Sequence, residues 1–292
     1  VNCQAIIPHY NIGTKTSYSQ VGLFTIKLKA IEKILLSLNA FIYIFLNRPH
    51  IVHIQGLNSA LIIPLIRILG IKVVFTSHSR DWLFPEWSLL AKIILRIFFS
   101  ISLKFSNKVV FINEFTARKY KLVNSVCIKN VTEKVDRKKL KINNDFIKNN
   151  LDVLNLKPFK YILFVGRISP VKGIEVLLKA INLLEEKVSL VLAGDIQDKI
   201  YLKKLEEISK KKDIYFLGPI DTFKLKSFYF NSALVVIPSF FEEHSMVFYE
   251  ALECGARLLV SNIDVFKTID KNRVKKFKVG DHMDLSKKIS SF

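Results

Sequence analysis

Two glutamates, Glu242 and Glu250, are separated by seven residues, and the second falls inside a predicted helix. The first turn of that helix, formed by Ser245, Met246 and Val247, offers backbone N–H groups that have no carbonyl partner within the helix. Such groups bind phosphate, and a nearby carboxylate can accept two hydrogen bonds from a ribose diol. Either glutamate alone is explained as a capping or solvent-facing residue. Together they indicate a site for a phosphorylated ligand such as a nucleotide.

A second group of chemically useful residues follows a buried strand predicted at 161–165. The strand ends at Gly166, Arg167 comes next, and Lys172 and Gly173 lead into the following helix. Arg offers a planar fork for phosphate oxygens and Lys a compact positive charge. In so Lys-rich a chain, the alternative is a pair of solvated loop cations. The glycines and the strand–loop–helix context favour a site for a diphosphate.

A histidine, His78, follows another apolar run, which is predicted as a buried strand at 72–76. Ligands of parallel α/β folds bind at the carboxyl ends of strands. His78 is therefore a candidate partner for a sugar hydroxyl or a phosphate, with Asp81 nearby, and the alternative is a loop histidine without chemistry. His53 lies within a predicted strand, so we expect it in the core or behind the residues that contact ligand.

These residues need a scaffold, and apolar strands and helices alternate almost throughout the sequence. The alternation predicts an α/β fold with parallel sheets and crossover helices. The helix expected at 89–105 carries Lys92, Arg96 and Lys104, and its alternatives are packing on a sheet and lying on a membrane surface. Asp221 is expected to cap the helix that follows it. The expected strands are 51–54, 72–76, 108–112, 161–165, 189–193, 214–217, 234–237 and 258–261, and the expected helices are 59–69, 89–105, 174–184, 202–210, 222–231 and 245–255.

The alternation stops between about 129 and 160, where Lys, Asn and Asp dominate. We therefore predict two Rossmann-like doubly wound domains that face a cleft, at 1–130 and 161–292, joined by a linker with a polar helix at 131–160. The sequence begins at Val1 inside a strand-like run, so we expect the first domain to be incomplete at its amino end. The segment 278–292 is short for a helix that would cross back to the first domain.

Lys and Arg outnumber Asp and Glu 45 to 25, which gives a formal net charge of +20. Three interpretations are open: compositional drift, since Lys, Ile, Asn and Phe are enriched together; attraction to an anionic membrane surface or a phosphorylated substrate; and nucleic-acid binding. The cations are scattered, and no zinc-finger, RNP or glycine-loop pattern accompanies them. Nucleic acid is therefore not expected as a partner.

Cys3, Cys127 and Cys254 are far apart in the sequence, and none belongs to a CxxC pair. This spacing indicates neither a disulfide framework nor a zinc site, and it fits a reducing cytoplasm. No apolar run is long enough for a spanning helix. We expect a cytoplasmic protein, and the charge adds peripheral attachment to the inner face of the plasma membrane as an alternative.

The motifs occur in an order that resembles the GT-B retaining glycosyltransferases of family four, the glycosyl transferases group 1. The resemblance covers nearly the whole chain and is strongest over 161–262. In the first half, residues 48–56 and 76–82 are similar to bacterial members that build capsule or lipopolysaccharide, including rhamnosyltransferases. The motifs that carry the resemblance are Gly166-Arg167 with Lys172-Gly173, Leu192-Ala193-Gly194, Phe216-Leu217-Gly218, Pro238-Ser239, and Glu242 with Glu250-Ala251-Leu252-Glu253-Cys254-Gly255.

The resemblance implies metal-independent transfer of a hexose from a nucleoside diphosphate sugar to a glycan or lipid-linked acceptor, without a cofactor. It also implies electrostatic stabilisation of the leaving diphosphate and no protein nucleophile, unlike the carboxylate pair of double-displacement glycosidases. The domain at 161–292 would bind the nucleotide sugar and the domain at 1–130 would lie on the acceptor side. The implied contacts are Gly166, Arg167 and Lys172 with the diphosphate, Ser245, Met246 and Val247 with the phosphate at the helix N-terminus, Glu250 with the ribose, Ile220 with the base, and Glu242 and His78 with the sugar.

The sequence also departs from the family pattern. Glu243 and His244 replace the Gly and the aromatic residue usual after the first glutamate, so the helix N-terminus is expected to be less open to phosphate. The amino-terminal glycine-rich loop of the family is absent. Two alternatives stay open: a truncated or degenerate GT-B protein that acts as a non-catalytic binding or partner subunit, and a sugar-nucleotide epimerase of the same architecture.

Overall fold

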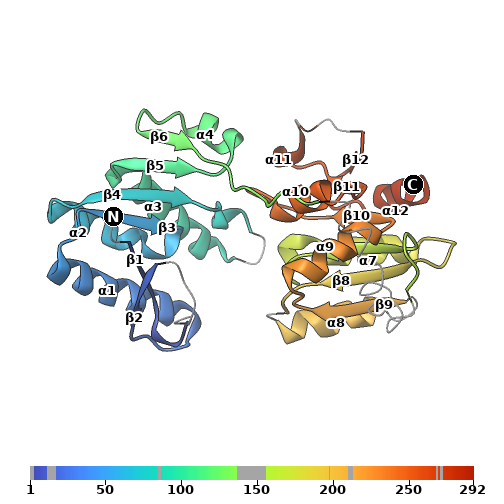
Figure 1. Ribbon diagram of the computed structural model, residues 1–292, viewed down its shortest axis with the longest axis horizontal. Coiled ribbons are helices and arrows are strands. Elements are labelled where there is room, and N and C mark those ends of the chain that lie inside the picture. Colours follow the sequence, from blue (N-terminus) through green and yellow to red (C-terminus); the bar gives the residue numbers. More distant parts are fainter. Residues whose placement is uncertain are drawn as a thin grey trace. The chain divides into compact units, whose positions relative to one another are not determined.

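The computed structural model describes residues 3–11, 18–84, 87–136, 156–196, 198–209, 213–267, 269 and 272–292 (Figure 1). Internal contacts divide the chain into two compact units. Unit 1 comprises Val1–Leu83 and Trp87–Lys129, and unit 2 comprises Phe84–Glu86 and Asn130–Phe292. The polar helix predicted within the linker at 131–160 falls mainly on residues 137–155, which lie outside the described residues.

Unit 1 is built on a four-stranded parallel sheet with the order β3-β4-β5-β6. Apolar β-branched and aromatic residues alternate toward its core, where Val73, Phe75, Val109 and Phe111 are fully buried. A separate pair of parallel strands, β1 and β2, precedes this sheet. The strands are β1 (Gln4–Pro8), β2 (Ser19–Leu23), β3 (Ile51–Gln55), β4 (Lys72–Ser77), β5 (Lys108–Phe111) and β6 (Ser125–Cys127).

The helices of unit 1 connect the strands as parallel pairing requires. The single helix predicted at 59–69 is divided: a 3-10 turn comes first, and an α-helix begins at Ile63 with Pro64 in its first turn. Proline suits that position because the first N–H groups of a helix have no internal acceptor. The elements are η1 (His9–Asn11), α1 (Lys29–Asn47), η2 (Leu57–Ile62), α2 (Ile63–Ile68), η3 (Asp81–Leu83), α3 (Leu89–Phe105) and α4 (Glu114–Tyr120).

Unit 2 contains a six-stranded parallel sheet with the order β12-β11-β10-β7-β8-β9 (Figure 1). From β7 the chain moves outward through β8 to β9, returns to place β10 beside β7, and then moves outward in the other direction. The predicted doubly wound topology is therefore confirmed for this unit, and its switch point lies between β7 and β10. The strands are β7 (Tyr161–Val165), β8 (Ser189–Ala193), β9 (Ile214–Gly218), β10 (Leu234–Ile237), β11 (Leu258–Ser261) and β12 (Val274–Phe277).

Both faces of this sheet are covered by helices, because alternate strand residues enter two separate cores. Ile162 and Phe164 of β7 belong to the core under α7, α8 and α12, whereas Tyr161 and Leu163 belong to the core under α9, α10 and α11. Nearly continuous apolar strands are what a sheet buried on both faces requires. The helices are η4 (Pro170–Lys172), α7 (Ile174–Asn182), α8 (Lys199–Ser209), α9 (Thr222–Asn231), α10 (Met246–Glu253), α11 (Asp264–Lys267) and α12 (His282–Ser290).

Two glycines allow the loops at the carboxyl edge of this sheet to touch through their backbones. Gly173 has φ +68°, and a Cβ at this position would lie 2.1 Å from the carbonyl oxygen of Pro238. Gly194 has φ +152°, and a Cβ there would lie 1.9 Å from the carbonyl oxygen of Gly166. Only glycine fits both the left-handed conformation and the space. The loop after β7 is thus held against the loops after β10 and β8.

We predict that Gly173→Ala destabilises the protein far more than Gly218→Ala. Gly218 has nearly the same φ, +66°, but a Cβ added there would meet no atom within 4 Å. Gly218→Ala should therefore cost only the conformational penalty of about 1–2 kcal/mol, and Gly173→Ala about 2 kcal/mol more because backbone atoms must separate. Urea unfolding of both variants measures the difference, and equal losses would contradict the contact.

Candidate functional site

The carboxyl edge of the unit 2 sheet brings together two of the loops singled out in the sequence. One follows β7 and the other follows β10, and these strands are neighbours at the switch point. The amide of Phe240 donates to the carbonyl oxygen of Val171 at 2.9 Å, so the two loops are also hydrogen-bonded to each other. Open α/β sheets bind ligands in the crevice at this position. The topology therefore places the candidate residues where a ligand site is expected.

Lys172 and Glu242 form an ion pair across the two loops. Lys172 Nζ lies 2.7 Å from Glu242 Oε1, and their side chains are 19% and 10% exposed. The Ser239 hydroxyl donates to the same carboxylate oxygen at 2.7 Å. Behind it, the Ser261 hydroxyl donates to the Ser239 carbonyl oxygen at 2.5 Å, which fixes the loop to β11. A largely buried carboxylate is thus stabilised by a cation and a hydroxyl.

Arg167 is the second cation of the loop after β7, and it is exposed to solvent. Its backbone position is set by the neighbouring residues: Gly166 N–H donates to the Ala193 carbonyl at 2.9 Å, and Ile168 N–H to the Asp195 carbonyl at 2.8 Å. The guanidinium therefore extends from an ordered loop into solvent at the same sheet edge as Lys172. Two positive charges are available there for an anionic ligand.

Helix α10 begins after Ser245, whose hydroxyl accepts from the amide of Phe248 at 3.4 Å. The predicted helix start is confirmed, and Met246 and Val247 form its first turn. Glu250 lies in the second turn, where its Oε2 accepts from the hydroxyl of Tyr229 on α9 at 3.1 Å. Burial raises the pKa of Tyr229 well above its usual range, and the adjacent negative charge of Glu250 adds to the shift.

The residues that depart from the family pattern are packed into the structure between Glu242 and α10. Glu243 is buried, and the imidazole of His244 stacks on the ring of Tyr249 with centroids 4.7 Å apart. Both side chains are thus engaged at the beginning of α10 instead of extending freely into solvent. Ile220, the candidate contact for a base, is half-buried and packs against the core under α9 and α10.

In unit 1, His78 directly follows β4 and belongs to a polar chain at the carboxyl edge of that sheet. His78 Nε2 lies 2.5 Å from Gln55 Oε1, the Gln55 amide nitrogen lies 3.1 Å from His53 Nε2, and His53 Nε2 lies 2.7 Å from Thr76 Oγ1. His53 is exposed, so its expected place in the core is wrong. Its position behind His78, linked through Gln55, agrees with the other expectation.

The environment favours the neutral form of both imidazoles. Partial desolvation by neighbouring residues lowers the pKa of His78, and partial desolvation together with the positive charge of a protonated His78 lowers the pKa of His53. A neutral His78 whose Nε2–H donates to Gln55 keeps Nδ1 as a hydrogen-bond acceptor. The ring can therefore accept a hydrogen bond from a hydroxyl group near neutral pH.

The structure brings Gly166, Arg167, Lys172, Glu242, Ser245, Met246, Val247 and Glu250 to one edge of the unit 2 sheet, whereas His78 belongs to unit 1. Sequence reasoning assigned no contact to Ser239, Gln55 or Tyr229. Ser239 and Gln55 both lie at the carboxyl ends of strands, and this placement was a usable signal. No sequence signal pointed to Tyr229, because its hydroxyl meets Glu250 only through the packing of α9 on α10.

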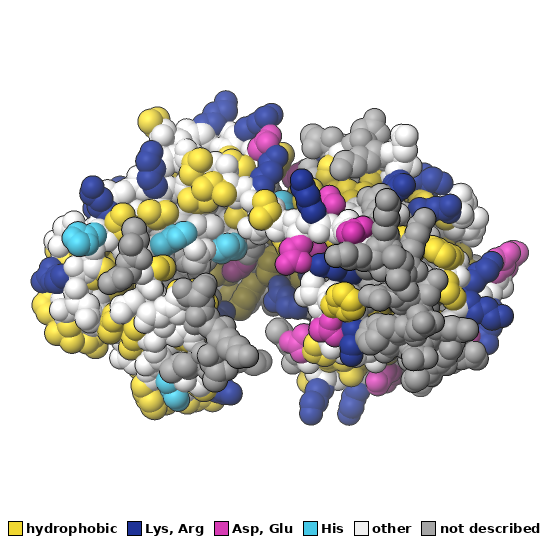
Figure 2. Space-filling model, viewed as in Figure 1, with side chains coloured by type: hydrophobic (Ala, Val, Ile, Leu, Met, Phe, Trp, Pro, Cys, Tyr) yellow, Lys and Arg dark blue, Asp and Glu magenta, His cyan; other side chains and the backbone are white. Residues whose placement is uncertain are grey.

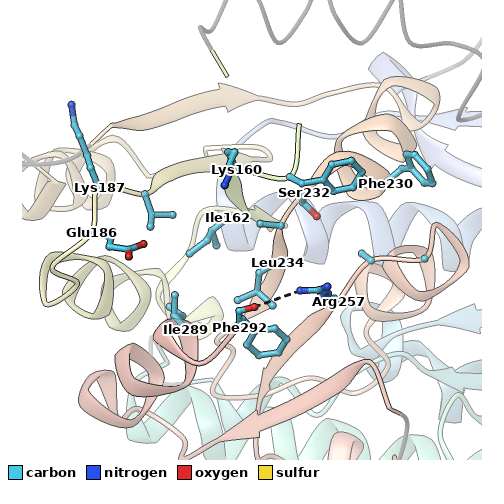
Figure 3. Close-up of a pocket in the computed structure, with 15 residues that line it drawn as sticks. Lys160, Ile162, Glu186, Lys187, Phe230, Ser232, Leu234, Arg257, Ile289 and Phe292 are labelled. Atoms are coloured by element: carbon cyan, nitrogen blue, oxygen red, sulfur yellow. Dashed lines mark hydrogen bonds between the residues drawn. The ribbon is translucent and has the colours of Figure 1, made fainter. Parts of the chain in front are cut away.

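A cavity of about 610 Å³ lies at the opposite, amino-terminal edge of the same sheet. Figure 3 shows the guanidinium of Arg257 directed at the carbonyl oxygen of Phe292, with Lys160, Ile162 and Leu234 nearby. This cavity is distinct from the edge that carries the candidate residues.

Among the described residues, no group of three or more His, Cys, Asp or Glu is arranged to hold a metal ion. No helix of the described part is long and apolar enough to cross a membrane.

Comparison with known proteins identifies the family to which the sequence is similar. The family described as Glycosyl transferases group 1 matches residues 146–292. An uncharacterized glycosyltransferase of Methanocaldococcus jannaschii is 36% identical over 118 residues, which are 39% of this chain and 30% of that protein. The alignments with the first curated relatives cover only 26–30% of the relatives' own length.

Solved structures are similar over most of the chain. Sucrose-phosphate synthase of Thermosynechococcus elongatus superimposes with a TM-score of 0.78 at 18% identity, covering 99% of this chain and 79% of that one. The Anabaena protein HepE in complex with UDP-glucose gives a TM-score of 0.74 at 15% identity, covering 94% and 76%. At these identities the likeness establishes the fold, and it confirms the predicted two-sheet α/β architecture of the GT-B type.

We predict that acid destabilises the protein partly through His53 and His78. Because both pKa values are lowered in the folded state, the unfolded chain binds protons more readily as pH falls below about 6.5. The free energy of unfolding should thus decrease between pH 7.5 and 5.5, and the decrease should be smaller in the double variant His53→Gln/His78→Gln. Urea unfolding at both pH values measures this, and an unchanged pH dependence would contradict the assignment.

Proposed function

Because the chain belongs to the glycosyl transferases group 1 family, we propose that it is a retaining glycosyltransferase using a nucleoside diphosphate sugar as donor. The observation that carries the proposal is the meeting of Lys172, Glu242 and the start of α10 at the switch point of the unit 2 sheet. The acceptor is a glycan or a lipid-linked glycan. In this proposal unit 2 binds the donor and unit 1 serves the acceptor side.

Donor binding begins with the diphosphate. Lys172 has three N–H donors and gives one to Glu242, so two remain for phosphate oxygens. Arg167 adds a planar pair of donors from the same loop. The N-terminal amides of α10, at Met246 and Val247, contribute further donors and the positive end of the helix dipole. Gly166 lets the loop backbone come close to the ligand.

The remaining contacts orient the nucleoside and the sugar. Glu250 accepts hydrogen bonds from the ribose hydroxyls, with its carboxylate oriented by Tyr229. Ile220 offers an apolar surface for the base. Glu242 uses Oε1 for Lys172 and Ser239, and its second oxygen is the acceptor assigned to hydroxyls of the transferred sugar.

The chemistry follows from where negative charge develops. As the glycosidic bond to the diphosphate breaks, Lys172 and the α10 amides stabilise the departing oxygens without reorganising, because they are already in place, and Arg167 joins them from the exposed loop. The departing phosphate takes the proton of the acceptor hydroxyl that attacks from the same face. Neutral His78 accepts a hydrogen bond from a sugar hydroxyl through Nδ1. No protein carboxylate forms a covalent intermediate.

The biological setting in this proposal is the assembly of a bacterial surface polysaccharide such as a capsule or a lipopolysaccharide. It is supported by the segments around His53 and His78, which are similar to those of bacterial members with that role. HepE binds UDP-glucose, so uridine diphosphate sugars are the first donors to test.

We predict that Arg167→Ala, Lys172→Ala and Glu250→Ala each weaken binding of UDP about tenfold or more. Each variant removes a charge-assisted hydrogen bond, which is worth about 1.5–3 kcal/mol. Isothermal titration calorimetry measures the effect. Lys199→Ala, which removes an exposed cation from α8, is the matched control and should bind like the wild type. Absence of UDP, ADP and GDP binding to the wild-type protein would contradict the proposal.

Measuring the products formed from a sugar nucleotide distinguishes a transferase from an epimerase and from a non-catalytic binding subunit. A transferase releases nucleoside diphosphate from the sugar nucleotide faster when an acceptor glycan is added, and a radiolabelled sugar appears in the acceptor. An epimerase yields an altered sugar without acceptor. A protein that binds the nucleotide but neither transfers nor hydrolyses the donor is the non-catalytic binding subunit.

Tyr229→Phe should weaken UDP binding about threefold to tenfold in the wild-type background and have no further effect in Glu250→Ala. The reason is that the Tyr229 hydroxyl acts through Glu250, to which it donates a hydrogen bond of roughly this worth. A double-mutant cycle by calorimetry tests the coupling. Equal losses in both backgrounds would show that Tyr229 acts independently of Glu250.

A further inference from the structure

Helix α3 of unit 1 buries one face in the core of the unit, and its opposite, exposed face is also apolar. Phe99 is buried among the core residues of unit 1, and its ring lies 4.8 Å from that of Trp82. On the other side, Leu89, Ile93 and Ile97 are 81%, 53% and 52% exposed. Their spacing of four residues places them along one side of the helix. Phe99 also meets Phe75 of β4, with ring centroids 6.4 Å apart, so the expected packing of this helix on a sheet is confirmed. A stripe of its apolar residues nevertheless stays exposed.

Cations accompany the exposed apolar residues of α3. Arg96 and Lys104 are exposed on the same side, and Lys92 is half-buried next to it. The helix contains no acidic residue. A shallow hollow of about 500 Å³ runs along it and is lined by α3 residues alone: Ile93, Arg96, Ile97, Ser100, Ile101, Lys104 and Phe105. We call these residues, with Leu89 and Leu90, the α3 face.

The α3 face lies in the more basic part of the chain. Residues 1–129 contain 16 Lys and Arg but only 4 Asp and Glu. Helix α1 has a similar stripe, with Ile34, Leu38 and Ile42 exposed, and both helices contact the η2 turn. Figure 2 shows hydrophobic side chains at the surface of unit 1 with Lys and Arg side chains among them. A soluble surface rarely exposes so many large apolar residues without a partner.

We propose that the α3 face docks on the surface of an anionic lipid bilayer. Helices that lie in a membrane interface combine an apolar stripe with Lys and Arg and are held by partial burial plus attraction to anionic headgroups. Helix α3 has 17 residues and carries Lys92, Arg96 and Lys104, which favours a position in the interface over one across the bilayer. The stems of Arg96 and Lys104 can lie along the apolar stripe while their charges reach the headgroups.

Charge argues against a second copy of the chain as the partner. In a symmetric dimer the same patch would meet itself, so Arg96 and Lys104 would face like charges. An acidic headgroup layer instead supplies the opposite charge over the whole length of α3. The proposal goes beyond the proposed transferase activity and does not depend on it, because lipid binding is measured without donor or acceptor.

The test is co-sedimentation of the intact chain with vesicles of phosphatidylcholine containing about 30 mol% phosphatidylglycerol, compared with phosphatidylcholine alone. The wild type should bind the anionic vesicles more tightly, and less so as salt rises. Arg96→Glu/Lys104→Glu should reduce the partition coefficient at least about tenfold, since each cation near such a surface is worth about fivefold. Lys199→Glu/Lys203→Glu changes the net charge equally on exposed residues of α8, and should have a much smaller effect.

A second variant tests the apolar part without changing charge. Ile93→Ser/Ile97→Ser should also reduce vesicle binding, and every variant should keep the far-UV circular dichroism spectrum of the wild type and unfold cooperatively in urea, which shows that it is folded. Equal binding to neutral vesicles, an undiminished Arg96→Glu/Lys104→Glu variant, or an equal loss in the α8 control would overturn the proposal. So would a concentration-dependent dimer abolished by Ile93→Ser/Ile97→Ser, because a second copy would then cover the α3 face.

Discussion

The close backbone contact between Gly173 and Pro238 is the constraint on which the arrangement of the candidate donor site depends. Without a side chain at Gly173, the loop after β7 reaches the carbonyl of Pro238, and Phe240 N–H completes the connection by donating to Val171. Lys172 is thereby brought within 2.7 Å of Glu242, although the two residues are 70 positions apart in the sequence. The contact spans the switch point of the sheet, so the approach of Gly173 to Pro238 that joins the two loops also brings the charged residues of the site together.

Lys172 and Glu242 place opposite charges side by side in a largely buried part of the site, and this arrangement determines which groups can bind a diphosphate. The carboxylate of Glu242 is stabilised by Lys172 and Ser239, while Arg167 extends into solvent. An entering diphosphate therefore meets one cation already held in position and one that adapts to it. Glu250 is held in a comparable way by Tyr229, whose burial keeps its hydroxyl protonated and able to donate. In the proposed transferase, Ser239 and Tyr229 do not contact the donor, but they hold Glu242 and Glu250 in position for the sugar and the ribose.

Much of this fold and site was predictable from the sequence, for identifiable reasons. The apolar runs of the unit 2 strands, the glycines after them and Asp221 as a cap are local signals, and the structure confirms them. The split of the helix after β3 was missed although Pro64 signalled it. The exposure of His53 and the contact from Tyr229 to Glu250 could not be predicted, because they depend on which strand or helix face meets which neighbour. Sequence periodicity identifies which face of a helix or strand is buried, but the packing of the elements decides which residues of other elements that face contacts.

The central claim is that a nucleoside diphosphate binds at the carboxyl edge of the unit 2 sheet, between the loops after β7 and β10. Titration of the isotopically labelled chain with UDP, followed by NMR of the backbone amides, tests it most directly. The account predicts that the amide signals of Gly166, Gly173, Val247 and Glu250 shift in a saturable manner, while those of Lys160 and Arg257 at the opposite edge do not. Shifts confined to the cavity around Arg257, or no saturable shift at Gly173 and Val247, would contradict it.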